Sequence, residues 1–304
     1  MAITSWWGRT VAAVSLLVCA GAFAQVDEPA AQRLSGTLAK ARETGSITIG
    51  YRESSIPFSY LSPRGVPIGY SIDLCKLLVD AIAEAVGKPI AIRYAPVTSD
   101  TRIGAVQSGA VDLECGSTTS NLERQKLVSF SPIIFVSGTK LMVPKASSIR
   151  SFRDLAGKRV VTTSGTTNAK ALAEIKTKFN VDMTILSAPD HAASFKMLTD
   201  GQADAFATDD VLLYGLIAQN NAKKDFIVVG DYLSYDPYGV MFRKGDPQLA
   251  RLVAETFGHL AEDREIERRY EQWFLKKLPS GPSLDLPMSA QLDTIIQSMG
   301  AKPE

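Results

Sequence analysis

Short runs of apolar residues and longer stripes with helical spacing follow one another along the first half of the chain. They predict strands at 46–54, 90–97 and 111–115. They also predict one short opening helix that contains Leu34, Leu38 and Ala41, and two further helices at 71–87 and 98–109. The helix at 71–87 should end at Gly87, and Thr98 or Ser99 should cap the helix that begins beside them. The segment 54–69 is rich in Pro, Ser and Gly and is predicted as a loop.

The second half continues this alternation. Strands are predicted at 135–143, 159–165, 204–210, 226–230 and 239–244, helices near 168–179, 190–201 and 210–222, two amphipathic helices through 246–278, and a loop-like tail at 279–289. Strands that alternate with helices indicate an α/β fold with parallel strands. Two such units, around 46–130 and 150–230, precede a return to a strand after 239, so we expect two lobes between which the chain crosses twice. A two-lobed protein can bury a ligand between its lobes, at the carboxyl ends of its strands.

Composition excludes several classes of function. The 304 residues are 45% hydrophobic and 21% charged, with 33 Lys plus Arg against 32 Asp plus Glu, as in ordinary globular proteins of about two domains. A formal charge of +1 without a basic cluster argues against a nucleic-acid partner. The two His and three Cys show no ligand spacing for a metal, so neither a metal nor a cofactor is predicted.

The N-terminus has the order of a secretory signal. Arg9 precedes an apolar run that ends in a small-x-small sequence at 22–24, which predicts cleavage after Ala24 and export. The apolar run is too short to span a bilayer of about 30 Å, and no later run reaches about 18 uninterrupted apolar residues. A lipoprotein signal that uses Cys19 is the alternative, but Val18 before it is larger than processing favours.

Cleavage there leaves Cys75 and Cys115 in the mature chain. In an oxidising compartment such a pair is a candidate disulfide. Two buried thiols are the alternative, because cysteine is among the residues most often found inside proteins.

The run ECGSTTSNLERQ at 114–125 carries the most informative chemistry. A predicted strand ends there in hydroxyls, among them Ser117 and Thr119, and Arg124 adds a planar fork that matches a carboxylate. The run therefore predicts an anion pocket, with a helix cap and a solvated Arg as the alternative. The run TTSGTTN at 162–168 also follows a strand, but it lacks the Lys of a phosphate-binding loop, so nucleotide binding is not expected.

Four other residues at strand or helix ends could contact a ligand. Asp209 could accept hydrogen bonds from an ammonium group or cap the next helix. Arg52 and Arg102 could each pair with a second carboxylate or lie on the surface. His191 begins a helix, where a capping or surface role is as consistent with the sequence as ligand contact.

Seven segments, in this order, resemble the family 3 periplasmic solute-binding proteins of polar amino acid ABC transporters, most closely the glutamate/aspartate-binding members. The resemblance covers nearly the whole mature chain. Its most specific pieces are YRESSIPFSY, GYSIDLC, VTSDTRI, ECGSTTSNLERQK, VTTSGTTN, SAPDHAASF and ATDDVLL, at 51–60, 69–75, 97–103, 114–126, 161–168, 187–195 and 207–213. Members of the family do not always carry a Cys at the position of Cys75, so the disulfide stays open.

The resemblance implies an α/β, two-lobed type II periplasmic binding protein fold, in which two mixed, mostly parallel sheets are joined by two hinge strands. Lobe 1 would comprise 25–137 plus 239–304, and lobe 2 would comprise 138–238. It implies a monomeric periplasmic protein that is not an enzyme. Such a protein closes by hinge motion on L-glutamate or L-aspartate and delivers it to the permease and ATPase of an ABC importer.

The resemblance also implies roles for the residues at the site. Arg124 would hold the α-carboxylate with Ser117, Thr119 and Thr167, Asp209 would pair with the α-ammonium group, and the side-chain carboxylate would be held by Arg52, Arg102, Ser99 and His191. Three arginines facing two ligand carboxylates give a near balance of charge. The alternative is an exported enzyme of the same fold, such as a cyclohexadienyl-type dehydratase. Its acid or base would have to come from Glu53, Glu114 or Asp209.

Overall fold

The computed structural model describes residues 1–2, 33–279 and 281–301. The predicted signal sequence, apart from its first two residues, and the cleavage after Ala24 lie outside this range. Within it, no helix is long and apolar enough to cross a membrane. The same residues contain no group of His, Cys, Asp and Glu side chains that could hold a metal ion.

One sheet contains five strands in the order β5, β1, β6, β15, β7. Their bounds are Ala91–Pro96, Ser46–Tyr51, Leu113–Glu114, Met241–Arg243 and Val128–Phe130. β1 pairs in parallel with β5 and β6, whereas β15 runs antiparallel to β6 and β7. The helices of this part are α1 (Gly36–Thr44), α2 (Tyr70–Val86), α3 (Arg102–Ser108), α4 (Leu122–Gln125) and α8 (Pro247–Glu262). α2 ends at Gly87 as predicted, with a left-handed φ of 72°.

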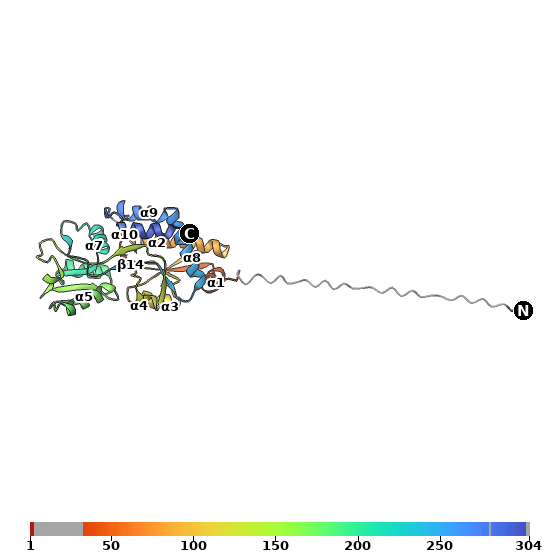
Figure 1. Ribbon diagram of the computed structural model, residues 1–304, viewed down its shortest axis with the longest axis horizontal. Helices are drawn as coiled ribbons and strands as arrows, with labels where there is room; N and C mark the ends of the chain where they lie inside the picture. The colour runs from red at the N-terminus through yellow and green to blue at the C-terminus, as the bar shows by residue number, and fades with distance from the viewer. Residues whose placement is uncertain (3–32, 280, 302–304) are drawn as a thin grey trace. The chain divides into compact units, whose positions relative to one another are not determined.

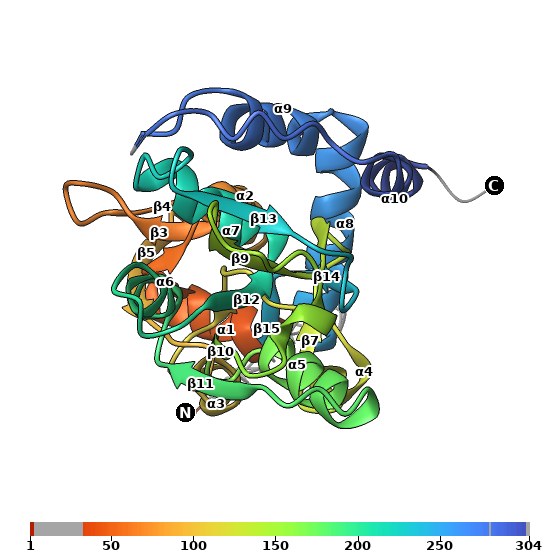
Figure 2. The same cartoon turned by 90° about the vertical axis from the view of Figure 1, so that its left-hand side faces the viewer.

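A second sheet contains five strands in the order β11, β10, β12, β9, β13, which Figure 2 shows from bottom to top. Their bounds are Thr184–Ala188, Arg159–Thr163, Ala205–Asp209, Thr139–Pro144 and Phe226–Val229. β10 pairs in parallel with β11 and β12, and β9 runs antiparallel to β12 and β13. This part contains the helices η2 (Phe152–Leu155), α5 (Thr167–Lys178), α6 (His191–Thr199) and α7 (Asp210–Gln219). Both sheets are therefore mixed, as predicted, but each has two parallel and two antiparallel pairings rather than mostly parallel ones, because β15 and β9 enter from the hinge in the opposite direction.

Two short strands connect the two sheets. β8 (Phe135–Ser137) and β14 (Asp236–Tyr238) pair antiparallel with each other, and Figure 1 shows α5 and α7 on one side of β14 and α1 and α8 on the other. The chain runs from β8 into β9 and returns from β14 into β15. The predicted two-lobed α/β architecture with two hinge strands is confirmed. The exact lobe boundaries stay a prediction.

The single strand predicted at 135–143 is wrong, because the chain breaks it at Gly138 into β8 and β9. A Cβ atom on Gly138 would lie 2.3 Å from the carbonyl oxygen of Ser234. The close approach of a second segment therefore requires glycine at this point.

The cap predicted for the third helix is also wrong. α3 begins only at Arg102, after Thr101. The Thr98 backbone N–H donates to Thr101 Oγ1 at 2.9 Å, and Thr98 Oγ1 accepts from the Thr101 N–H at 3.2 Å. These bonds stabilise a turn before the helix, and the Ser99 side chain takes no part in them.

Three further segments differ from the predicted pattern. The loop at 54–69 contains a small sheet of β2 (Ser54–Ser55), β3 (Ser59–Leu61) and β4 (Pro67–Ile68). The second of the two late helices is short: α9 (Glu265–Tyr270) passes into a π-helical turn, η3 (Glu271–Leu275). α10 (Ala290–Gly300) follows the predicted tail, where the pattern indicated no element. Ser289 caps it by accepting from the Leu292 N–H at 3.2 Å.

An aromatic cluster packs behind the hinge strands. Phe135 of β8 lies 5.0 Å from Phe274 between ring centroids, and Phe58 lies 5.1 Å from Tyr238 of β14. Tyr70 of α2 contacts both Phe58 and Phe274 edge to face. These buried rings attach the hinge to α2 and to the C-terminal part of the chain.

Cys75 of α2 and Cys115 after β6 form a disulfide, so the alternative of two free thiols is wrong. Both cysteines are fully buried. The bond attaches α2 to the segment that begins the 114–125 run.

Replacing Cys75 and Cys115 together by Ala should lower the free energy of unfolding by about 2 to 4 kcal/mol. The bond closes a loop between residues 40 positions apart, and removing it restores entropy to the unfolded chain. Urea unfolding of the mature protein measures this difference. A reductant should lower the unfolding midpoint of the wild-type protein and leave that of the double variant unchanged. Equal midpoints for the two proteins without reductant would contradict the prediction.

Candidate ligand-binding site

The predicted site residues follow the carboxyl ends of six strands, three in each sheet. After β1, β5 and β6 come Arg52, Ser99 with Arg102, and Ser117 with Thr119. At the ends of β10, β11 and β12 are Thr167, His191 and Asp209. Because β1 is parallel to its neighbours β5 and β6, and β10 to β11 and β12, each set of loops gathers at one edge of its sheet.

The two edges together form one pocket. Its walls contain eight predicted residues, together with three that were not predicted: Arg52, Ser99, Arg102, Ser117, Thr119, Thr167, His191 and Asp209, with Thr166, Asn168 and Leu212. Arg124, the ninth predicted residue, lines an adjoining hollow that shares Thr166 and Thr167 with the pocket. Its Nη1 donates to the Thr119 carbonyl at 3.0 Å and its Nη2 to the Gly165 carbonyl at 3.3 Å.

The surface alternative does not hold for the arginines, and the capping bonds are made by residues other than the predicted site residues. Arg52 and Arg102 are each 2% exposed, and Arg124 is 8% exposed. Asn121 caps α4 and Asp190 caps α6. Asp209 precedes α7 but makes no side-chain capping bond.

Four buried polar atoms of the pocket residues have no hydrogen-bond partner among the described residues: Arg52 Nη1, Arg102 Nε, Ser99 Oγ and Ser117 Oγ. An unpaired buried donor costs about 1 to 3 kcal/mol, and more when it is charged. Each of the four can donate a hydrogen bond. The pocket therefore presents a set of unmet donors that suits an anion with several oxygens.

Neighbouring side chains hold the guanidinium group of Arg102 and the backbone of Arg52. Arg102 Nη1 donates to Thr118 Oγ1 at 2.6 Å, and Thr118 Oγ1 donates to Glu114 Oε2 at 2.6 Å. The Arg52 backbone N–H donates to Ser59 Oγ at 2.9 Å. Burial, followed by the neighbouring Arg102, lowers the pKa of Arg52 to about 10, so this guanidinium stays cationic at neutral pH.

Asp209 brings to the pocket an acidic side chain, whose charge when ionised is opposite to that of the arginines. Its Oδ1 accepts from Asn168 Nδ2 at 2.7 Å, and its Oδ2 accepts from the Tyr238 hydroxyl. Burial, followed by the charge of Asp236, raises the pKa of Asp209 well above its ordinary value. A cation that binds beside Asp209 would favour its ionised form.

Asp236 of the hinge strand β14 joins both edges of the pocket. Its Oδ1 accepts from Thr119 Oγ1 at 2.9 Å and from Thr167 Oγ1 at 2.7 Å. The two threonines follow strands of different sheets. One hinge carboxylate thus holds hydroxyls from both halves of the pocket.

The two halves also approach each other closely outside the pocket. A Cβ atom on Gly165, whose φ is 69°, would lie 2.4 Å from Asp100 Oδ1. Lys170 Nζ lies 2.8 Å from Glu123 Oε1 in an exposed ion pair. These contacts join segments that follow β10 to segments that follow β5 and β6, so the structure describes a closed pocket.

The sequence profile of the bacterial extracellular solute-binding proteins, family 3, matches residues 47–276. The chain belongs to this family. It is 45% identical over 290 residues to the L-glutamate/L-aspartate-binding protein of Pseudomonas aeruginosa, covering 94% of this chain and 96% of that one. It is 39% identical over 272 residues to the glutamate/aspartate import solute-binding protein of Escherichia coli, covering 89% of this chain and 90% of the relative.

Solved structures of amino acid-binding proteins have the same fold. An ancestral arginine-binding protein bound to glutamine matches with a TM-score of 0.68 at 27% identity, over 76% of this chain and 98% of its own. An ancestral amino acid-binding protein that is a precursor of cyclohexadienyl dehydratase matches with a TM-score of 0.68 at 29% identity, over 78% of this chain and 99% of its own. The type II periplasmic binding protein fold is thereby confirmed.

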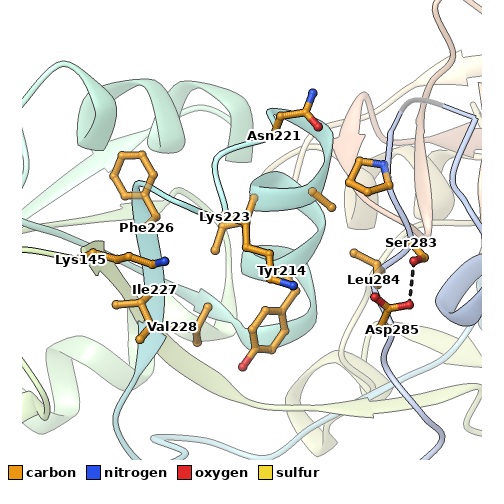
Figure 3. Close-up of a pocket in the computed structure, with 13 residues that line it drawn as sticks. Lys145, Tyr214, Asn221, Lys223, Phe226, Ile227, Val228, Ser283, Leu284 and Asp285 are labelled. Atoms are coloured by element: carbon orange, nitrogen blue, oxygen red, sulfur yellow. Dashed lines mark hydrogen bonds between the residues drawn. The ribbon is translucent and has the colours of Figure 1, made fainter.

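Figure 3 shows a second, larger hollow of this family 3 protein, which shares no lining residue with the pocket. It is bounded by α7, β13 and the segment 282–285, and its wall includes Tyr214, Phe226 and Lys145. In the part of the chain that the structure describes, the residues that line this hollow have no buried side-chain polar atom that lacks a hydrogen-bond partner. It therefore lacks the convergent unmet groups that distinguish the smaller pocket.

Sequence reasoning missed three residues that hold the site together, namely Asn168, Asp236 and Tyr238. Asn168 ends the run TTSGTTN, so its neighbourhood was marked although its own role was not. Asp236 and Tyr238 lie on β14, far along the chain from their partners, and no local pattern indicates those contacts.

Proposed function

We propose that this family 3 protein binds L-glutamate or L-aspartate and delivers it to the permease and ATPase of an ABC importer. The observation that carries the proposal is the set of four buried, unpartnered donors around a pocket that also contains an acceptor carboxylate. An acidic amino acid brings two carboxylates and one ammonium group. The names of the relatives from Pseudomonas aeruginosa and Escherichia coli support the same ligands.

The α-carboxylate is assigned to Arg124 and Ser117, and the α-ammonium group to Asp209. Arg124 supports this role because it is nearly buried and stays cationic: burial, and then Arg102, lower its pKa to about 10. Thr119 and Thr167 give their hydroxyl protons to Asp236, so those oxygens are left to accept hydrogen bonds. We therefore propose that these hydroxyl oxygens accept hydrogen bonds from the ammonium group rather than donate to the α-carboxylate.

The side-chain carboxylate is assigned to Arg52, Arg102 and Ser99, with His191 beside them. Arg52 Nη1, Arg102 Nε and Ser99 Oγ are the donors that a second carboxylate would pair. A neutral amide offers one acceptor oxygen and no negative charge, so it forms no ion pair with either guanidinium group. This part of the pocket therefore selects acidic over neutral ligands.

The protein is proposed to act in the periplasm as a monomer, after its signal sequence is removed at Ala24. The ligand would be enclosed as lobe 2, residues 138–238, closes on lobe 1, residues 25–137 plus 239–304. The contacts of Asp236 with Thr119 and Thr167 support this closure, because they join a hinge residue to one residue of each lobe. A monomer suffices, since every proposed ligand contact lies within one chain.

Binding rather than catalysis fits the carboxylates near the pocket. A dehydratase would need a general acid or base in contact with substrate. Glu53 is exposed, and Glu114 bonds to Thr118; neither lines the pocket. Asp209 faces it, but two hydrogen bonds and the proposed ammonium contact occupy its oxygens.

A thermal unfolding screen against the natural amino acids tests the proposal. L-glutamate and L-aspartate should raise the unfolding temperature, because a ligand at 100 times its Kd stabilises the folded state by about 2.7 kcal/mol. Sodium chloride at matched ionic strength is the control for a general effect of anions. A larger rise with arginine or glutamine than with either acid would refute the assignment.

A further inference from the structure

A chain of hydrogen bonds behind the pocket determines which nitrogen of His191 carries a proton. His191 Nδ1 lies 2.8 Å from Thr163 Oγ1, and Thr163 Oγ1 lies 2.8 Å from Ser194 Oγ. Ser194 Oγ in turn donates to the backbone carbonyl of Asp190 at 2.9 Å. All three side chains are buried.

The direction of each bond follows from the number of hydrogens available. A carbonyl oxygen only accepts, so the single hydroxyl proton of Ser194 points at Asp190. Thr163 must then give its own single proton to Ser194. The remaining contact holds only if His191 Nδ1 carries a proton and donates it to Thr163. With the proton on Nε2 instead, the two hydroxyl protons would have to serve three contacts, so one of the three would lack a hydrogen.

A neutral His191 with its proton on Nδ1 has a lone pair on Nε2. The ring lines the ligand pocket, and no described residue donates a hydrogen bond to Nε2. The groups around the ring are the cations Arg52 and Arg102, with Asp209 across the pocket and Asp190 at the start of its own helix. Burial, and then Arg52 and Arg102, lower the pKa of His191 well below its ordinary value, which agrees with a neutral ring.

We propose that an acidic ligand binds together with one proton, which His191 takes up on Nε2 from solvent. The inference rests on the proposed function, because it needs the side-chain carboxylate of the ligand beside the ring. A lone pair and a carboxylate oxygen are both acceptors and repel each other. Protonation converts Nε2 into a charged donor, and the ligand carboxylate is the opposite charge that stabilises it.

Glutamine should bind without this proton, because its side-chain amide can donate directly to the lone pair on Nε2. The discrimination between glutamate and glutamine should therefore increase as the pH falls from 8 towards 6. Proton release from Asp209 on binding the ammonium group acts on both ligands, so it cancels in that comparison.

Nitrogen NMR of the imidazole rings tests the proposal directly. The sequence contains only two histidines, and His259 is exposed on α8, so a His259→Gln variant assigns both rings. In ligand-free protein, His191 should show a protonated Nδ1 and an unprotonated Nε2. With saturating L-glutamate both nitrogens should be protonated, while His259 stays unchanged. A ligand-free ring protonated on Nε2, or a ring that stays neutral in the glutamate complex, would overturn the proposal.

Calorimetry in buffers of different ionisation enthalpy gives a second readout. Wild-type protein should take up more protons with L-glutamate than His191→Gln does, by up to about one proton per site. His259→Gln is the matched control and should equal wild type. Equal proton counts for wild type and His191→Gln would also overturn the proposal. If glutamate gives neither heat in any buffer nor a rise in the unfolding temperature of wild type, the proposed function fails as well, whereas binding to a His191 that stays neutral contradicts proton uptake alone.

Discussion

Replacing Arg124 by Ala should weaken the binding of every amino acid ligand, by about 3 to 5 kcal/mol, which is a loss of roughly a hundred- to several-thousand-fold in Kd. Arg124 is nearly buried, and its planar fork is assigned to the α-carboxylate, a group that all amino acids share. Its loss leaves that carboxylate enclosed without a cation. Titration calorimetry with L-glutamate and L-aspartate measures the effect.

Arg124→Lys is the matched variant for charge. It keeps a cation but loses the fork that now reaches the Thr119 and Gly165 carbonyls, so it should recover only part of the affinity. Unfolding curves of both variants separate a loss of binding from a loss of folding. If Arg124→Ala spared either acidic ligand, the role assigned to this residue would be wrong.

Replacing Arg102 by Met should weaken the binding of L-glutamate by about 3 to 5 kcal/mol. It should leave the weak binding of L-glutamine comparatively unchanged. Arg102 is assigned to the side-chain carboxylate, where the neutral amide forms no ion pair. Met fills a similar length of the pocket wall without charge. The measurement is the titration of both ligands into both proteins.

Arg93→Met, on the exposed face of β5, is the control for removing a positive charge from the same lobe, and should change neither Kd. Unfolding of Arg102→Met should also be recorded, because Thr118 loses the hydrogen bond from Arg102 in this variant and the buried Glu114 loses a nearby cation. Equal weakening of glutamate and glutamine would contradict the division between the two ends of the ligand.

Much of the fold could be predicted because local signals mark its elements. The apolar stripe of α2 ends at Gly87, and its positions Leu74, Leu78 and Ile82 are buried as their spacing predicts. The break at Gly138 could not be predicted, since it depends on the approach of Ser234 from another segment. α10 was missed because it follows the Pro-rich tail and buries only Leu292 and Ile296.

The candidate site was predictable to the extent that its residues follow strands. Eight of the nine predicted residues line one pocket because parallel strands present their ends at the same edge. The supporting contacts were not predictable in the same way. Asp236 reaches Thr119 from a position 117 residues away, and Tyr238 reaches Asp209 from another strand. Such pairings depend on how the hinge folds back between the two sheets.

The most direct test of the account is a calorimetric titration of L-glutamate and L-glutamine into one preparation of the mature protein, unfolded, dialysed and refolded to remove bound ligand. The account predicts a micromolar or tighter Kd for glutamate, or about −8 kcal/mol or better. Glutamine should bind at least about 100-fold more weakly, because it cannot pair with Arg52 and Arg102 as a carboxylate does. Glutamine binding as tightly as glutamate, or more tightly, would contradict the account.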